Sequence, residues 1–598
     1  RHMLAAKGKF HHVSACCDKP TTDISGTNVN SQGAHTTQED ETLGEEQLAE
    51  HATPSPWQRS TVSAIPNGFR ILGSREIKAL SGSSLGKKIS HMLEFKGCDE
   101  LKRGSPLSVV LRRGASVFAT SSGSEATYAL SQQVERIGAF VSHNWVTSAW
   151  LKFMALTLHF NFGAAFVLSV LLLLLLGTAS AFGALPKIYD AVHKEDVGFL
   201  CQVLCIPCFL FTLLFLRDVE HVFLPSRETL FLDVLCIDQT SADTKRKGID
   251  KLGAFVRHSD TMIILHTDIY LRKLWTVYEV ATFLALHPLE NLVVLPVFRA
   301  RVFYCVTVAC WIRFILLIPV QTFDTTSLGE VRTQRWVYTG LFFLMMACYF
   351  RIWAFDKKQM NDSLKEFRVA NCICVCESDR TVVEDAIADI MQAAQMVKRS
   401  SSKKQALKGF DSLVSRGLPE VFDRVIGKLT FAYEQLAILG ILLYGADAAD
   451  KLARNSATEL AILSYALKCT WRGLFQFPVS LALLEICVSR ALLEKWLSFQ
   501  SQWLSLWSTR LWNGCLVFLA ALLITAFLIL DDHLLDDELT VPYDIILLGF
   551  LHLTGPLMLY HVFGGMFGQS LKMWLSGIFM SQRRHVHTLP TLRRLDTE

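Results

Sequence analysis

The chain has 598 residues, 51% of them hydrophobic, and its mean hydropathy is positive at +0.31. A water-soluble protein of this length is rarely so apolar, so the composition predicts several membrane-spanning segments. The formal net charge of +4 gives no indication of nucleic-acid binding. The 16 cysteines are scattered, and the chain is too long for a disulfide-stabilised scaffold, so we interpret them mainly as reduced thiols.

Residues 1–133 form a polar N-terminal region, rich in Ser, Thr, Gly, Glu and Lys. Apolar residues are too sparse there to bury a core, which predicts that the region is mostly disordered. Short pieces such as Pro106–Arg113 are expected to form a local strand or helix at most.

From Ile137 onward, short apolar runs alternate with helical patterns in three stretches, residues 137–159, 229–297 and 367–397. Alternation of this kind predicts an α/β fold with a five-stranded parallel sheet of the flavodoxin-like type, covered by helices on both faces. The expected strands lie in Ala139–Ser142, Leu230–Gln239, Ile249–His266, Asn291–Val297 and Phe367–Cys376. The expected helices include Val146–His159, Leu271–His287 and Thr381–Val397.

Two predicted transmembrane helical hairpins interrupt this soluble unit, at residues 162–216 and 302–353. Each contains a pair of apolar segments joined by a short link, so the chain returns to the side of the membrane that it left. That return is required if strands before and after a hairpin share one sheet. The four expected spans are Phe162–Phe182, Gly198–Leu216, Val302–Val320 and Val337–Trp353.

A basic linker is expected at residues 398–428, a helical transmembrane region at 429–567, and a basic tail at 568–598. With about eight spans in all, the sheet and the tail lie on the same side, which the positive-inside rule assigns to the cytosol. The acidic loop Asp531–Glu538 then lies outside. The C-terminal spans are expected at Leu429–Gly445, Trp471–Arg490, Leu511–Leu530 and Ile545–Phe567.

Three stretches resemble TIR (Toll/interleukin-1 receptor) domains. Ala139–Trp145 reads AFVSHNW, and TIR domains have a similar first strand that ends in Ser-His or Ser-Tyr; FLDVLCIDQ is similar to their second strand. Leu274–Val280 resembles the family's Trp-containing third helix, with Thr276 and Val280 in place of the usual Cys and Leu. The piece LCIDQ is also similar to fungal incompatibility domains, but the Trp-x-x-x-Glu pattern favours TIR.

The resemblance implies a chemistry, because some TIR domains cleave NAD at the bond between nicotinamide and ribose. Their catalytic glutamate lies on the third helix, where this chain has Glu279. A carboxylate there would stabilise the positive charge that develops on the ribose carbon. The alternatives are that Glu279 is a structural partner for Arg272, Lys273 or His266, or that it is simply exposed at the start of the helix. NAD is thus expected as a substrate, and no cofactor or metal is required.

Further candidate ligand-binding residues are Ser142, His143, Trp145, Asp238 and Trp275. Ser142 and His143 end the first strand at the carboxyl edge, where open α/β sheets bind ligands, although Ser142 could also cap the next helix. The two tryptophans could stack on a nicotinamide or adenine ring, or serve as core anchors. Asp238 could meet a ribose hydroxyl, or simply form a turn.

Three functions stay open at this point. The first is membrane signalling with NAD hydrolysis, and the second is a non-catalytic TIR-like scaffold. The third is a channel or transporter regulated by the α/β domain, in which Arg313 or Glu434 at membrane depth would act. The expected partners are the lipid bilayer and other TIR-like domains, including further copies of the chain, and no nucleic acid.

Overall fold

The computed structural model describes residues 82–493 except 191–194, 224–227, 323–327, 427–428 and 454–458, together with Leu72, Ile77 and Leu80. The predicted spans Leu511–Leu530 and Ile545–Phe567 and the tail 568–598 lie outside the described residues. So does most of the N-terminal region before residue 82.

A six-stranded mixed sheet with strand order β2-β1-β6-β3-β7-β8 forms the centre of the α/β unit. Its parallel part comprises β3 (Ile137–Ser142), β6 (Thr229–Phe231), β7 (Ser259–His266) and β8 (Leu292–Pro296). In chain order this part runs 2-1-3-4, as in flavodoxin-like sheets. The predicted α/β class is therefore confirmed, whereas a five-stranded, wholly parallel sheet is wrong.

The antiparallel edge comes from residues that composition assigned to the mostly disordered region. β1 (Arg103–Pro106) pairs with β6 and with β2 (Gln132–Gln133). Around these strands lie α2 (Ser84–Leu93), η2 (Asp99–Leu101), α3 (Leu107–Ala115), η3 (Ser116–Phe118) and α4 (Glu125–Tyr128). Leu107, Val110 and Leu111 are fully buried. Their partners belong to distant elements, so local composition underestimated how much of this region is ordered.

The second predicted strand is shorter than expected. β6 ends at Phe231, and the next residues form the one-turn helix α7 (Asp233–Cys236). A buried apolar run does not by itself distinguish a strand from a helical turn. Here the Asp233 carboxylate accepts a hydrogen bond from the Val234 amide at 2.8 Å, which favours the turn. The helices that follow are α8 (Ala242–Asp250) and α9 (Leu252–Arg257).

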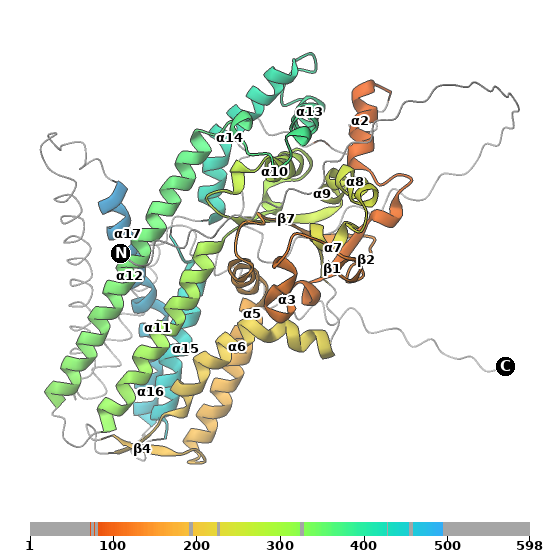
Figure 1. Cartoon of the computed structure of the whole chain (residues 1–598). Coiled ribbons are helices and arrows are strands. Elements are labelled where there is room, and N and C mark those ends of the chain that lie inside the picture. Colours follow the sequence, from red (N-terminus) through yellow and green to blue (C-terminus); the bar gives the residue numbers. More distant parts are fainter. Residues whose placement is uncertain are drawn as a thin grey trace, which may run out of the picture. The chain divides into compact units, whose positions relative to one another are not determined.

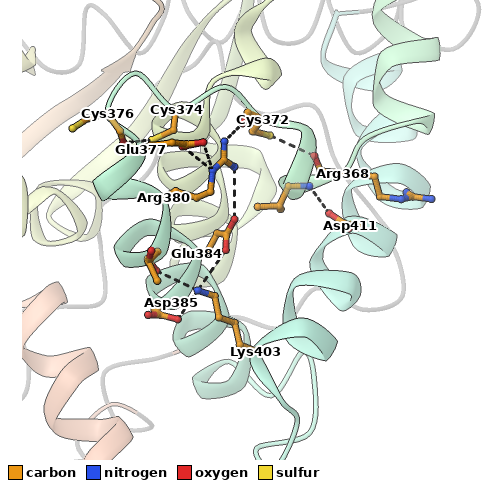
Figure 2. Close-up of polar contacts among 12 residues, drawn as sticks. Arg368, Cys372, Cys374, Cys376, Glu377, Arg380, Glu384, Asp385, Lys403 and Asp411 are labelled. Atoms are coloured by element: carbon orange, nitrogen blue, oxygen red, sulfur yellow. Dashed lines mark hydrogen bonds and ion pairs between the residues drawn. The ribbon is translucent and has the colours of Figure 1, made fainter.

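The fifth predicted strand, Phe367–Cys376, is also wrong. It contains the short helix η6 (Val369–Asn371) and a single parallel bridge between Ile373 and Lys273. Side chains bond the backbone here instead of a neighbouring strand (Figure 2): Asp411 accepts from the Val369 amide at 2.8 Å, and Arg380 donates to the Cys372 carbonyl at 3.0 Å. The helix α13 (Glu377–Ala393) follows.

Long apolar helices leave the sheet at the two predicted interruptions (Figure 1). After β3, the expected helix and the first expected span form one continuous helix, α5 (Ala149–Ala181), because no residue between them breaks it. A small antiparallel hairpin of β4 (Lys187–Asp190) and β5 (Glu195–Gly198) connects it to α6 (Leu200–Phe223). After β8 come α11 (Val297–Thr322) and α12 (Leu328–Lys365).

Within the described part of the chain, four helical stretches are long and apolar enough to cross a membrane. They coincide with four of the predicted spans, which is compatible with a membrane protein. The predicted span Val302–Val320 falls within α11, and the predicted span Leu429–Gly445 overlaps the helix α15 (Tyr433–Lys451); neither is among the four. The four stretches are Ala149–Ala181, Leu200–Val222, Val337–Lys365 and Leu463–Ser489.

A buried polar clamp joins α5 to α6. The fully buried Asn161 donates from Nδ2 to the Leu213 carbonyl at 2.8 Å and accepts from Arg217 Nε at 2.7 Å. Arg217 also pairs with Glu220 at 2.5 Å. The side-chain amide of Asn161 and the guanidinium of Arg217 thus both have hydrogen-bond partners, as is usual for buried polar groups.

Most of the expected basic linker at residues 398–428 is helical, as α14 (Lys403–Ile426). Its buried residues Ala406, Phe410, Val414 and Leu418 recur every four positions, so one face packs into the core. The remaining described elements are α15 (Tyr433–Lys451), α16 (Glu459–Thr470), the π-helical turn η7 (Trp471–Gln476) and α17 (Phe477–Leu493).

Replacing Gly440 by Ala should destabilise the contact between α15 and η7 by about 1–3 kcal/mol. A Cβ at Gly440 would clash with the carbonyl oxygen of Gly473, which is backbone and cannot move aside easily. Thermal unfolding in detergent micelles measures this change. Gly445→Ala is the matched control, because its Cβ would meet side chains and no backbone: the end of Leu173 at 3.1 Å and the Cys469 sulfur at 3.9 Å. Equal melting temperatures for the two variants would contradict the prediction.

Candidate functional site at the carboxyl edge of the sheet

Ser142, Tyr270 and Glu279 form a hydrogen-bonded group at the carboxyl end of β3. Ser142 is the last residue of the strand and is 1% exposed. Its hydroxyl donates to Glu279 Oε2 and lies 2.5 Å from the Tyr270 hydroxyl. The structure therefore brings together the expected catalytic glutamate and the expected serine from the strand end. Tyr270 was not anticipated from the sequence.

The helix α10 (Leu274–Leu286) carries Glu279 in its second turn. Its N-terminus is held by the segment that was expected to be the fifth strand: the Leu274 amide donates to the Ile373 carbonyl at 3.1 Å, and the Ile373 amide donates to the Arg272 carbonyl at 2.6 Å. Thr276 adds a side-chain hydrogen bond to the Tyr270 carbonyl at 2.6 Å. These contacts fix the start of α10, and thereby the position of Glu279, relative to the sheet.

The Glu279 carboxyl is protonated more readily than an ordinary glutamate. Burial of the carboxyl raises its pKa from 4.5 to about 8, although the residue as a whole keeps some solvent exposure. The hydrogen bond from Ser142 opposes this rise in pKa, and the negative charge of Asp233 adds to it. A buried carboxyl with a displaced pKa at a strand end is typical of a functional position.

The aromatic side chains of His143, Trp145 and Phe118 lie beside this hydrogen-bonded group. The Trp145 indole donates from Nε1 to Asp233 Oδ2 at 3.0 Å. The His143 ring packs edge-on against Trp145 and Phe118, with centroid distances of 4.6 and 5.1 Å. Burial lowers the pKa of His143 to about 4, so the ring is neutral at physiological pH. His143 and Trp145 therefore lie in one group, as expected of residues that follow a single strand end.

Lys152 is the unexpected member of this group. Its side chain is fully buried in the first turn of α5, with Nζ 4.9 Å from the Trp145 ring centre and 5.3 Å from that of Phe118. Among the described residues, Nζ has no hydrogen-bond partner. Burying an ammonium costs several kcal/mol, and cation–π contact returns only about 0.5–2 kcal/mol. A single lysine between Leu151 and Phe153 was the sequence signal for this residue.

Asp238 and Trp275 make other contacts. The Asp238 carboxylate accepts from the backbone amide and the hydroxyl of Thr240 at 2.9 and 2.7 Å, as a turn-forming aspartate does. These hydrogen bonds also lower the pKa of Asp238. The half-buried Trp275 packs edge-on against Tyr278, with centroids 6.0 Å apart. These contacts agree with the role of a turn-forming residue for Asp238 and with that of a packing residue for Trp275.

Comparisons with known proteins assign the chain to no family. No protein-family model matches the chain, and neither a curated protein nor a solved structure matches it. The class that the fold and the site define is thus an α/β unit joined to long apolar helices, with a buried carboxyl at the carboxyl edge of its central strand.

Proposed function

We propose that this chain is a multi-pass membrane signalling protein whose TIR-like α/β domain hydrolyses NAD through Glu279. The observation that carries the proposal is the contact between Glu279 and Ser142 at the end of β3. Open parallel sheets bind nucleotides at this edge, beside the central strand where the chain order reverses. In this sheet β3 is that strand, with β6 on one side and β7 on the other.

The proposed reaction breaks the bond between the ribose carbon and the nicotinamide nitrogen. The bonding electrons leave with nicotinamide, which becomes neutral, and positive charge develops on the ribose. The Glu279 carboxylate stabilises that charge, and water then forms the new bond to carbon and releases a proton. The positive charge of bound nicotinamide favours the ionised form of Glu279, which burial otherwise disfavours.

The test is nicotinamide release by the full chain in lipid nanodiscs supplied with NAD, measured by chromatography. Release that depends on protein concentration and is absent from empty nanodiscs would support the proposal. Many signalling domains act only when clustered, so the assay is repeated on vesicles at high surface density. Absence of nicotinamide under both conditions would refute the hydrolase and leave the non-catalytic scaffold and the regulated channel as the remaining functions.

The α/β domain and the C-terminal tail are proposed to lie in the cytosol. Arg217 near the end of α6, and Arg299 and Arg301 near the start of α11, support this orientation by the positive-inside rule. The β4–β5 hairpin would then lie on the opposite face. Protease digestion of sealed vesicles with the cytosolic face outward should cleave the loop before α8 and spare this hairpin; the reverse pattern would refute the orientation.

A gated anion pathway is the second candidate function, and one observation favours it. Arg313 of α11 donates to the Thr339 hydroxyl at 3.2 and 2.8 Å beside a cavity of about 30 Å³, whose lining includes Tyr444 and Ser480. A guanidinium at membrane depth that bonds a neutral hydroxyl could attract an anion. Chloride flux into proteoliposomes that Arg313→Leu abolishes would support this function, and unchanged flux would exclude a role for Arg313.

A further inference from the structure

Three buried polar atoms without hydrogen-bond partners in the described chain belong to residues that follow β3 or pack beside its carboxyl end: His143 and Lys152 both contact the rings of Phe118 and Trp145, and Asn144 lies between His143 and Trp145 in the chain. They are His143 Nε2, Asn144 Nδ2 and Lys152 Nζ. His143 is 8% exposed, Asn144 5% and Lys152 0%, so water in bulk does not satisfy them. Buried polar groups are nearly always bonded in native proteins, so such a cluster calls for an explanation.

The chemistry of the cluster favours a negatively charged ligand with several oxygen atoms. Asn144 accepts from the Val146 amide through Oδ1 at 2.9 Å, which leaves its Nδ2 as a donor. The Lys152 ammonium is a second donor and carries a charge. Asp233 attracts it electrostatically, but both Asp233 oxygens are engaged, by the Val234 amide and the Trp145 indole. The neutral His143 ring adds an atom that donates or accepts according to its tautomer.

We infer that Asn144 and Lys152 bind the diphosphate of a nucleotide, between the rings of Phe118 and Trp145. This inference rests on the proposed function and specifies which part of the substrate is held beside Glu279. The diphosphate supplies oxygen acceptors for both donors and a counter-charge for the buried ammonium. Without it, Lys152 lowers the stability of the fold in exchange for binding.

Entry of the ligand requires Phe118 to move, and the backbone before it is suited to this. Arg113, Gly114 and Ala115 all have positive φ angles, of 52°, 64° and 54°. Such angles are strained for Arg and Ala, and strained segments gather at ligand clamps and switches. These residues immediately precede η3, which presents Phe118 to His143 and Lys152.

The test compares wild type with Lys152→Met in phosphatidylcholine nanodiscs by thermal unfolding, using inorganic pyrophosphate and ADP-ribose as probes. Each probe should raise the wild-type Tm by at least about 3 °C. Lys152→Met should have a Tm about 3 °C higher than wild type without probe, because a buried charge is removed, and should show no shift with probe. Lys247→Met, at an exposed position of α8, should behave as wild type.

A lower Tm for Lys152→Met with an undiminished probe shift would overturn the inference, because Lys152 would then be a structural cation–π anchor. A headgroup phosphate is the other source of this chemistry. If anionic-lipid nanodiscs reproduce the Lys152-dependent stabilisation while pyrophosphate has no effect, the nucleotide assignment is overturned.

Kinetics separate this inference from the proposed function. In Lys152→Met the KM for NAD should rise at least about tenfold while kcat changes little, since the residue holds the substrate and not the reacting bond. Nicotinamide release with an unchanged KM would refute the diphosphate site and leave the hydrolase intact. Lys152-dependent binding of pyrophosphate without nicotinamide release would refute the hydrolase and leave the site.

Discussion

Replacing Glu279 by Gln should lower kcat/KM for nicotinamide release at least about 100-fold. The substitution keeps the size of the side chain and its contact with Ser142, but removes the negative charge that stabilises the developing ribose cation. Release of nicotinamide from NAD at pH 8, followed by chromatography, measures the effect. The proteins are compared in nanodiscs of the same composition.

Glu125→Gln is the matched control, because Glu125 is an exposed carboxylate in the first turn of α4. It should retain wild-type activity. Thermal unfolding of Glu279→Gln should show a folded protein, since an uncharged amide suits a buried position at least as well as a carboxylate. A folded Glu279→Gln protein with wild-type activity would rule out Glu279 as the catalytic residue.

The pH dependence of kcat/KM should follow the ionisation of Glu279 in the free protein. With a pKa of about 8, activity should rise about tenfold from pH 6 to pH 7, about fivefold more from pH 7 to pH 8, and then level off. Ser142→Ala should move the profile to higher pH, because the hydrogen bond from Ser142 lowers the pKa of Glu279. Initial rates at low NAD concentration between pH 6 and pH 9 provide the measurement. A profile that is flat over this range would contradict the assignment.

Stability should depend on pH through the same group. The pKa of Glu279 in the folded state, about 8, lies above its usual value of 4.5, so the native state holds the proton more tightly than the unfolded chain. The stabilising contribution is complete below pH 4.5 and is lost as the pH rises through about 8. Glu279→Gln should therefore lose less stability than wild type between pH 6 and pH 9.

The pattern of apolar residues in the sequence predicted most of the strands and helices, because the burial of each element requires apolar residues at regular positions along it. The runs at Ala139–Ser142 and Asn291–Val297 contain the strands β3 and β8, and four of the long apolar runs in the described part of the chain are helices long enough to span a membrane. Such signals survive because strands covered on both faces, and helices in lipid, must be apolar along their whole length. The prediction for Phe367–Cys376 was wrong because its alternation is typical of a strand, whereas its backbone groups form hydrogen bonds with the side chains of Asp411 and Arg380 and not with a neighbouring strand.

Some residues of the candidate site could be predicted from the sequence, and others could not. The sequence indicated Glu279 and Ser142 through their resemblance to TIR motifs, and the structure places them in contact. It did not indicate Tyr270 or Phe118, because their relevance arises from segments far apart in the chain. Lys152 was visible as a lone charge in an apolar helix, yet only its burial under Trp145 and Phe118 makes it notable.

The sequence by itself determined the alternation of strands, helices and apolar spans, since these patterns follow from the burial of neighbouring residues. Only the tertiary structure decided which strands are paired, that residues before Ile137 complete the sheet, and that Ser142 meets Glu279. Those outcomes depend on backbone and side-chain partners from distant segments. Hydrogen-bond satisfaction between distant segments leaves no periodic trace in the chain, whereas burial does.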